Sequence, residues 1–162
     1  MTWPRAFLYV ALAAVLAAVL WATTPTAPPV VAPAERPRTD VVAVAVEARG
    51  RRVEARREGE RWQVAPAGAA TSDLVDALLA AILDAPAEPL ASDASRRAEF
   101  GLDAPSARVI IGRAAGPPVT LLVGADNPAG TGIYGQLEGN PQVVLMGRNV
   151  RYYIDLLTRP PQ

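Results

Sequence analysis

The sequence predicts an α+β domain in which a mainly antiparallel sheet carries two amphipathic helices on one face, preceded by one N-terminal transmembrane helix. Three observations predict this fold. The chain opens with an uncharged apolar run, it continues with β-branched runs separated by tight-turn signals, and two later segments carry apolar residues at helical spacing. We therefore expect a transmembrane signal-anchor at residues 1–22, a linker at 23–39 and the domain at 40–162.

The apolar run at residues 6–22 is long enough for a short membrane-spanning helix. Trp3 and Trp21 bracket it, and a helical rise of 1.5 Å per residue separates them by about 27 Å, close to the hydrocarbon thickness. Arg5 lies on the N-terminal side, so we expect a single-pass inner-membrane protein with a cytoplasmic N-terminus and a periplasmic domain. Secretion after signal cleavage is the alternative, although no small-residue cleavage site precedes the prolines.

The linker at residues 23–39 contains five prolines, which prevent the helix from continuing. Proline-rich segments favour extended polyproline geometry, so the linker has a reach of about 50 Å. It serves either as a spacer or as an unstructured join. Both interpretations place the start of the folded unit near Asp40.

The first half of the domain begins with a β-branched run at residues 41–46, which predicts a buried strand. Residues 52–64 read as a hairpin, with Gly59 at the turn because glycine accepts a positive φ. Residues 70–85 then change to helical spacing, and Ser72 is the expected N-cap.

The second half returns to strand patterns after a short helical turn at residues 93–100. Turn signals rich in glycine and proline separate the strands. A closing helix follows at residues 149–157, with its apolar residues on one face. The expected strands are 108–111, 119–123, 133–137 and 142–146.

Composition excludes most catalytic chemistry. The chain has no Cys, His or Lys, so thiolate nucleophiles, imidazole bases, Schiff-base amines and zinc–sulfur sites are absent. Its 16 arginines balance 16 acidic residues, which gives no overall basic field for nucleic acid. We therefore expect a protein that is not an enzyme, with no metal or other cofactor.

Four residues are candidates for a ligand or partner surface. Trp62 is expected to pack on the sheet, and stacking on a carbohydrate is the alternative. The glycine-rich loop at residues 124–132 holds Asp126 and Asn127, but calcium takes about six to eight oxygens, so a plain strand connection is favoured. Tyr134, on the expected strand beyond the loop, completes the set.

Charged residues form two further groups. Paired carboxylates are the only acid–base device that the composition leaves; Asp103, Asp126 and Glu138 lie in the loop-rich second half, and nothing in the sequence brings two of them together. Six arginines alternate with glutamates on the first hairpin, which is typical of an exposed strand face with cross-strand ion pairs. A surface for an acidic partner is the alternative. These arginines are Arg49, Arg51, Arg52, Arg56, Arg57 and Arg61.

The order of these motifs resembles the bacterial DUF4340 family, a domain of unknown function. Its most specific match is Phe100-Gly101-Leu102-Asp103-Ala104-Pro105, and weaker matches surround it over roughly residues 40–148. The weaker matches are Gly59 to Trp62, Val64, Pro66, Asp73, Val75, Leu78, Leu79, Leu121 to Gly124, Asn127, Pro128, Gly130, Tyr134 and Val143 to Leu145.

The resemblance implies a membrane-anchored envelope protein, often encoded near ABC-type transporter components, and it transfers no catalytic residues. We therefore expect an accessory protein that binds an envelope or transporter protein. A periplasmic ligand- or polymer-binding module is the alternative, and a carboxylate-dependent hydrolase is a third hypothesis.

Overall fold

The computed structural model describes residues 38–66, 70–85, 87–90 and 96–160, and the account below refers to these ranges. The predicted transmembrane helix at residues 6–22 and most of the linker lie outside them. Within the described ranges, neither helix has the length and apolar character needed to cross a membrane.

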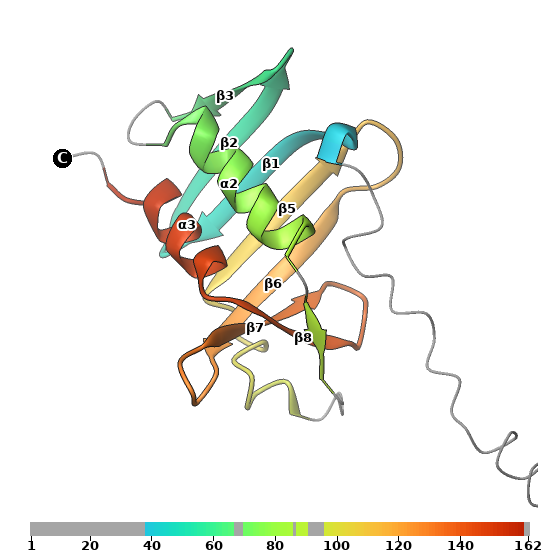
Figure 1. The fold of residues 1–162 in the computed structure, drawn as a ribbon, viewed down its shortest axis with the longest axis vertical. Helices are drawn as coiled ribbons and strands as arrows, with labels where there is room; N and C mark the ends of the chain where they lie inside the picture. Colours follow the sequence, from blue (N-terminus) through green and yellow to red (C-terminus); the bar gives the residue numbers. More distant parts are fainter. Residues whose placement is uncertain (1–37, 67–69, 86, 91–95, 161–162) are drawn as a thin grey trace, which may run out of the picture. The chain divides into compact units, whose positions relative to one another are not determined.

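The described residues form one eight-stranded antiparallel sheet and two helices (Figure 1). The strand order is β3-β2-β1-β5-β6-β7-β8-β4, so the first strand of the chain lies inside the sheet. The predicted α+β class with an antiparallel sheet is thereby confirmed. The strands are β1 Val41–Ala48, β2 Arg51–Glu58, β3 Arg61–Ala65, β4 Glu88–Pro89, β5 Ala107–Arg113, β6 Val119–Asp126, β7 Gly132–Leu137 and β8 Val143–Gly147; the helices are α2 Ser72–Leu83 and α3 Asn149–Leu157.

Both helices lie against the same face of the sheet (Figure 1), and the main core fills the space between the layers. Strand alternation explains this, because Val44 and Val46 on β1 point towards the helices while their neighbours point away. Leu78 and Leu79 of α2 are fully buried, and burying one such side chain stabilises the fold by about 1.5–3 kcal/mol. Helix α3 buries Val150, Ile154 and Leu157.

The sequence patterns predicted the bounds of most helices and strands to within a few residues. Gly59 has a φ of 63° in the predicted β2–β3 turn, and α3 has the predicted ends. Helix α2 is shorter than the predicted 70–85, and the prediction for Ser72 is wrong. Thr71 is the N-cap, and its side chain makes no capping hydrogen bond. The Ser72 hydroxyl instead accepts a 3.0 Å hydrogen bond from the Trp62 backbone N–H at the edge of the sheet.

Two features of the sheet were not predicted. Arg49 and Gly50, with φ angles of 54° and 71°, join β1 to β2 in a two-residue turn. At the far edge, β4 contributes only two residues, which pair with β8. A strand this short has too few residues to show a period in sequence.

The sheet face away from the helices is covered in part. Phe100 and Leu102 pack over β6 and β8, where they form a second apolar cluster with Leu122 and Val143. Over β1, β2 and β5, neither described helix lies on this side (Figure 1). We call this part the open face. Its side chains, identified from strand register, are Ala43, Ala45 and Glu47 of β1, Arg52, Glu54 and Arg56 of β2, and Arg108, Ile110 and Gly112 of β5.

Candidate functional site

Asn127 organises the loop after β6. Its Oδ1 accepts hydrogen bonds from the backbone N–H groups of Thr131 (2.8 Å) and Gly132 (3.0 Å), and its Nδ2 donates to Thr131 Oγ1 (3.0 Å). An Asn side chain that bonds the backbone in this way is a common device for closing a turn. The arrangement supports the strand-connection interpretation, because the Asn127 carbonyl already accepts two hydrogen bonds.

Asp126 is bound to Arg151 of α3. The guanidinium of Arg151 donates from Nε to Asp126 Oδ1 (2.8 Å), from Nη2 to the Gly124 carbonyl (2.7 Å) and from Nη1 to Ser106 Oγ (3.2 Å). Arg151 therefore holds α3 against the end of β6 and the approach to β5. Sequence reasoning missed this residue, since its partners lie 25 to 45 positions away and no local pattern marks them.

Two of the three candidate carboxylates are held by arginines, and the third lies apart from Asp126. Asp103 pairs with Arg97 at 3.2 Å, and Asp126 pairs with Arg151. Glu138 follows the C-terminal end of β7, whereas Asp126 pairs with Ile133 near its start, so the length of the strand, roughly 15 Å, separates them. In the described ranges, no three His, Cys, Asp or Glu residues gather in a way that would hold a metal ion.

Trp62 packs on the core and is only 5% exposed. Its indole N–H donates to Asp76 Oδ1 on α2 at 2.8 Å, and the Arg57 guanidinium lies 5.4 Å from the ring centroid. Stacking on a carbohydrate requires an open ring face, which this environment does not give. The structure thus places Trp62 between the sheet and α2, where it supports the fold.

Tyr134 belongs to the second apolar cluster. Its ring lies 4.7 Å from the ring of Phe100, centroid to centroid, at an interplanar angle of 59°. Tilted pairs of this kind contribute about 0.5–1.5 kcal/mol beyond area burial. Trp62 and Tyr134 therefore lie on opposite faces of the sheet, and the structure does not bring the four candidate residues together in one site.

The open face carries the cross-strand charges. Glu47 lies opposite both Arg52 on β2 and Arg108 on β5. Arg52 binds Glu47 and also donates from Nε to Glu54 at 2.7 Å, and the Glu54 carboxylate, followed by Glu47, raises the pKa of Arg52 above its ordinary value. The predicted cross-strand ion pairing is confirmed for Arg52 and Glu47. Arg108 has no ion-pair partner within the described ranges.

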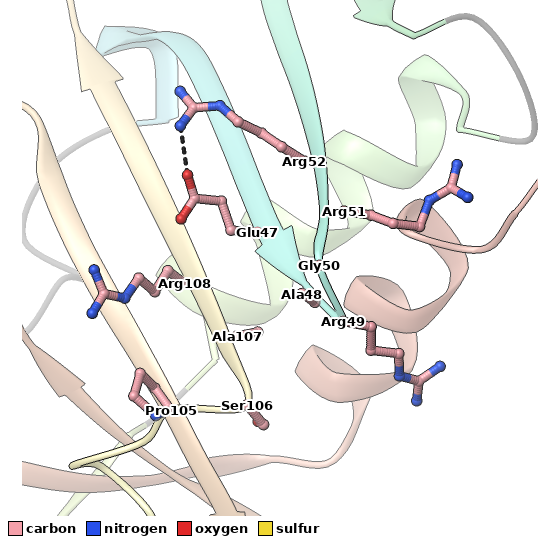
Figure 2. Close-up of a pocket in the computed structure, with 10 residues that line it drawn as sticks. All are labelled: Glu47, Ala48, Arg49, Gly50, Arg51, Arg52, Pro105, Ser106, Ala107 and Arg108. Carbon is pink, nitrogen blue, oxygen red and sulfur yellow. Dashed lines mark hydrogen bonds and ion pairs between the residues drawn. The ribbon is translucent and has the colours of Figure 1, made fainter.

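Two hollows lie along β1 and share Arg52 in their lining, and we call them together the β1 groove. One, of about 360 Å³, is lined by the β1–β2 turn and residues 105–108; the other, of about 320 Å³, extends to Ala43, Arg56 and Pro118. Figure 2 shows Glu47 and Arg52 joined on one side of the turn, while Arg49 and Arg51 point the other way. The guanidinium groups do not converge on one point, so the groove does not have the geometry of a small-anion site.

Arg49 is the one non-glycine residue of the described ranges with a positive φ, 54°. Asn is the usual residue at this turn position, since a bulkier side chain costs roughly 1 kcal/mol there. The Arg49 guanidinium contacts Asp155 of α3 at 3.0 Å, which ties the turn to the helix layer. The strained turn therefore fixes one end of the groove.

The comparisons with known proteins assign a family. A family model described as "Domain of unknown function (DUF4340)" matches residues 62–158. The chain belongs to the DUF4340 family. No curated protein and no solved structure matches the chain.

In this DUF4340 domain, the motif that carried the resemblance is structural. Gly101 has a φ of 66°, and a Cβ there would lie 2.9 Å from the Ala125 backbone nitrogen. Ala125 N–H in turn donates to the Phe100 carbonyl at 2.8 Å, and Leu102 is buried. The motif thus holds the chain against β6 by a backbone hydrogen bond, and the close backbone approach at Gly101 requires glycine.

Proposed function

We propose that this DUF4340 protein is an envelope accessory protein whose domain docks on another envelope or transporter protein and performs no catalysis itself. Residues 6–22 hold it in the inner membrane, and residues 38–160 stand on the periplasmic side. One observation carries the proposal. Two of the three candidate acid–base carboxylates, Asp103 and Asp126, are bound to arginines, whereas the open face presents a groove with arginines that have no ion pair in the described ranges.

Docking is tested best by site-specific photocrosslinking of the full chain in its own membranes. The chain has no Lys, so amine-reactive crosslinkers have few targets, and a genetically encoded photoreactive residue is the suitable probe. We expect discrete adducts with one partner from at least one surface position. A chain that gives no adduct from any position on the sheet face or on α3 would contradict docking.

The topology is tested separately with a reporter fused after Gln162. The proposal requires activity of a reporter that works outside the cytoplasm, and no activity of one that works inside. The reverse pattern would overturn the orientation. Retention in the membrane pellet after carbonate washing distinguishes an anchor from a cleaved signal, because a cleaved domain would be released.

A further inference from the structure

We propose that the β1 groove receives an extended acidic segment of the partner protein, with carboxylates at Arg56 and Arg108. This inference rests on the proposed function and names the chemistry of the docking segment. It follows from the floor of the groove, from the spacing of its cations and from the state of the sheet edges.

The floor of the groove is made of small residues. Ala45 is only 9% exposed although no helix covers it, because longer side chains of β2 and β5 rise beside it. At Gly112, a Cβ would come within 3.2 Å of the Ala43 Cβ, so the two strands approach closely there. The hollow is shallow and apolar, and Arg56 and Pro118 form part of its wall. A backbone with small or β-branched side chains fits such a floor.

The available cations lie at the two ends of the groove. Arg56 is opposite Ala43 and Arg108 is opposite Glu47, and these positions are four residues apart on β1, or about 13 Å. Neither arginine has an ion pair among the residues that the structure describes. Carboxylates four residues apart on an extended chain laid along β1 match this spacing in the strand direction and point to the same side, and the two arginines approach them from β2 and β5, which lie about 9.6 Å apart on either side of β1. Arg52, between them, is already paired with Glu47 and Glu54.

The size of the surface favours a segment over a second copy of this chain. Three strands about 4.8 Å apart and seven or eight residues long give an open area of roughly 400 Å². Stable dimers bury about 800 Å² on each partner. A second copy stacked on this face would fall short of that area, whereas an extended segment of about seven residues spans roughly 23 Å and covers the groove.

The edges of the sheet offer an extended partner little length of strand to pair with, since β4 has two residues and β3 has five. Strand β4 has two residues and one is Pro89, which has no N–H to donate. On β3, the outward N–H of Trp62 is already bound by Ser72. A partner segment is therefore directed to the face of the sheet, where recognition depends on side chains.

The test places the photoreactive residue at Ile110, beside the groove, and in a second strain at Tyr152, which is 59% exposed on α3. Adducts of the full chain in membranes are sequenced by mass spectrometry. We expect the Ile110 adduct to be a partner peptide with two carboxylates four residues apart. Arg56→Glu with Arg108→Glu should reduce this adduct about tenfold, which corresponds to two lost exposed ion pairs. Arg148→Glu, at an exposed position outside the groove, should leave it unchanged.

A defined probe supports the same test. A heptapeptide with two glutamates separated by threonine, valine and threonine should bind the full chain in nanodiscs, and the glutamine version should bind about tenfold more weakly. Equal binding of both peptides, or equal binding to the double variant, would overturn the inference. Near-UV circular dichroism confirms that each variant is folded, and Arg108→Gln, which reverses no charge, should give an intermediate loss.

The outcomes separate the two proposals. An Ile110 adduct with a second copy of this chain, or with a peptide that has no acidic pair, overturns the inference and leaves docking intact. Capture of a partner from Tyr152 alone also overturns the inference and supports the proposed function. Absence of an adduct from Ile110 overturns the inference, and absence of adducts from every position on the sheet face and on α3 also removes the proposed function.

Discussion

Gln136 on β7 tests how much a buried polar side chain reduces the stability of this domain. Its side chain is 1% exposed and lies between Leu122 and Val143 on the neighbouring strands. The Oε1 atom is buried and has no hydrogen-bond partner. A buried polar atom in this state costs about 1–3 kcal/mol, because it loses water and gains nothing in return.

Gln136→Met replaces the amide with an apolar side chain of similar length and volume. The substitution removes the desolvation cost and adds little strain, so we expect the free energy of unfolding to rise by about 1–2 kcal/mol. For a domain of this size, that raises the melting temperature by roughly 3–8 °C. Thermal and urea unfolding, followed by near-UV circular dichroism, measure both quantities.

The control is Gln63→Met on the exposed side of β3, for which we expect a change within about 0.5 kcal/mol. A Gln136→Met protein that is less stable than the parent would refute the reasoning. It would mean that the amide makes a bond of real value, for example to an ordered water molecule. Gln136→Glu is expected to destabilise the fold at neutral pH, because it buries a charge without a partner.

Three further predictions concern the contact of Gly124 with Phe100, the attachment of α3 and the effect of pH. Gly124→Ala places a Cβ against the Phe100 carbonyl oxygen and should cost about 1–3 kcal/mol, measured by urea unfolding; an unchanged midpoint would contradict the packing. Arg151→Met should lower the free energy of unfolding by about 1–2 kcal/mol and speed amide hydrogen exchange in α3. Unchanged exchange would show that Arg151 is not needed to hold α3 against the sheet. The hydrogen bond from Arg96 lowers the pKa of Glu99, so its stabilising contribution is present above the unfolded pKa of about 4.3 and is lost as pH falls through the lower folded value. NMR titration should show that Arg96→Gln moves this pKa back up.

Local patterns were sufficient to predict elements but not their neighbours. The valines of β1, the glycine of the β2–β3 turn and the apolar face of α3 each act within a few residues, so the sequence displays them. The sheet order depends on which hydrophobic faces fit together across the whole chain. Nothing in residues 41–48 indicates that β1 pairs with β5, whose first residue lies 59 positions after the end of β1.

The same contrast between local patterns and long-range contacts applies to the candidate site. The alternation of Arg52, Glu54 and Arg56 predicted an exposed strand face, and the structure shows the cross-strand ion pair between Arg52 and Glu47. The groove could not be predicted, because it depends on Gly112 and Ile110 being brought beside β1 from a distant strand. Ser72 shows the converse, since a good N-cap residue was used instead to satisfy a strand N–H.

The central position of β1 in the sheet affects where the boundaries of the family's domain should be drawn. The matched region starts at Trp62, inside β3, and so omits β1 and β2, yet β1 lies between β2 and β5. A fragment cut at that boundary would lose Val44 and Val46 from the core and leave the seven-residue β5 as an unpaired apolar edge. Such an edge is prone to aggregate. The region that the family model matches is therefore smaller than the unit that folds, and the strands outside it supply most of the residues that line the proposed docking groove.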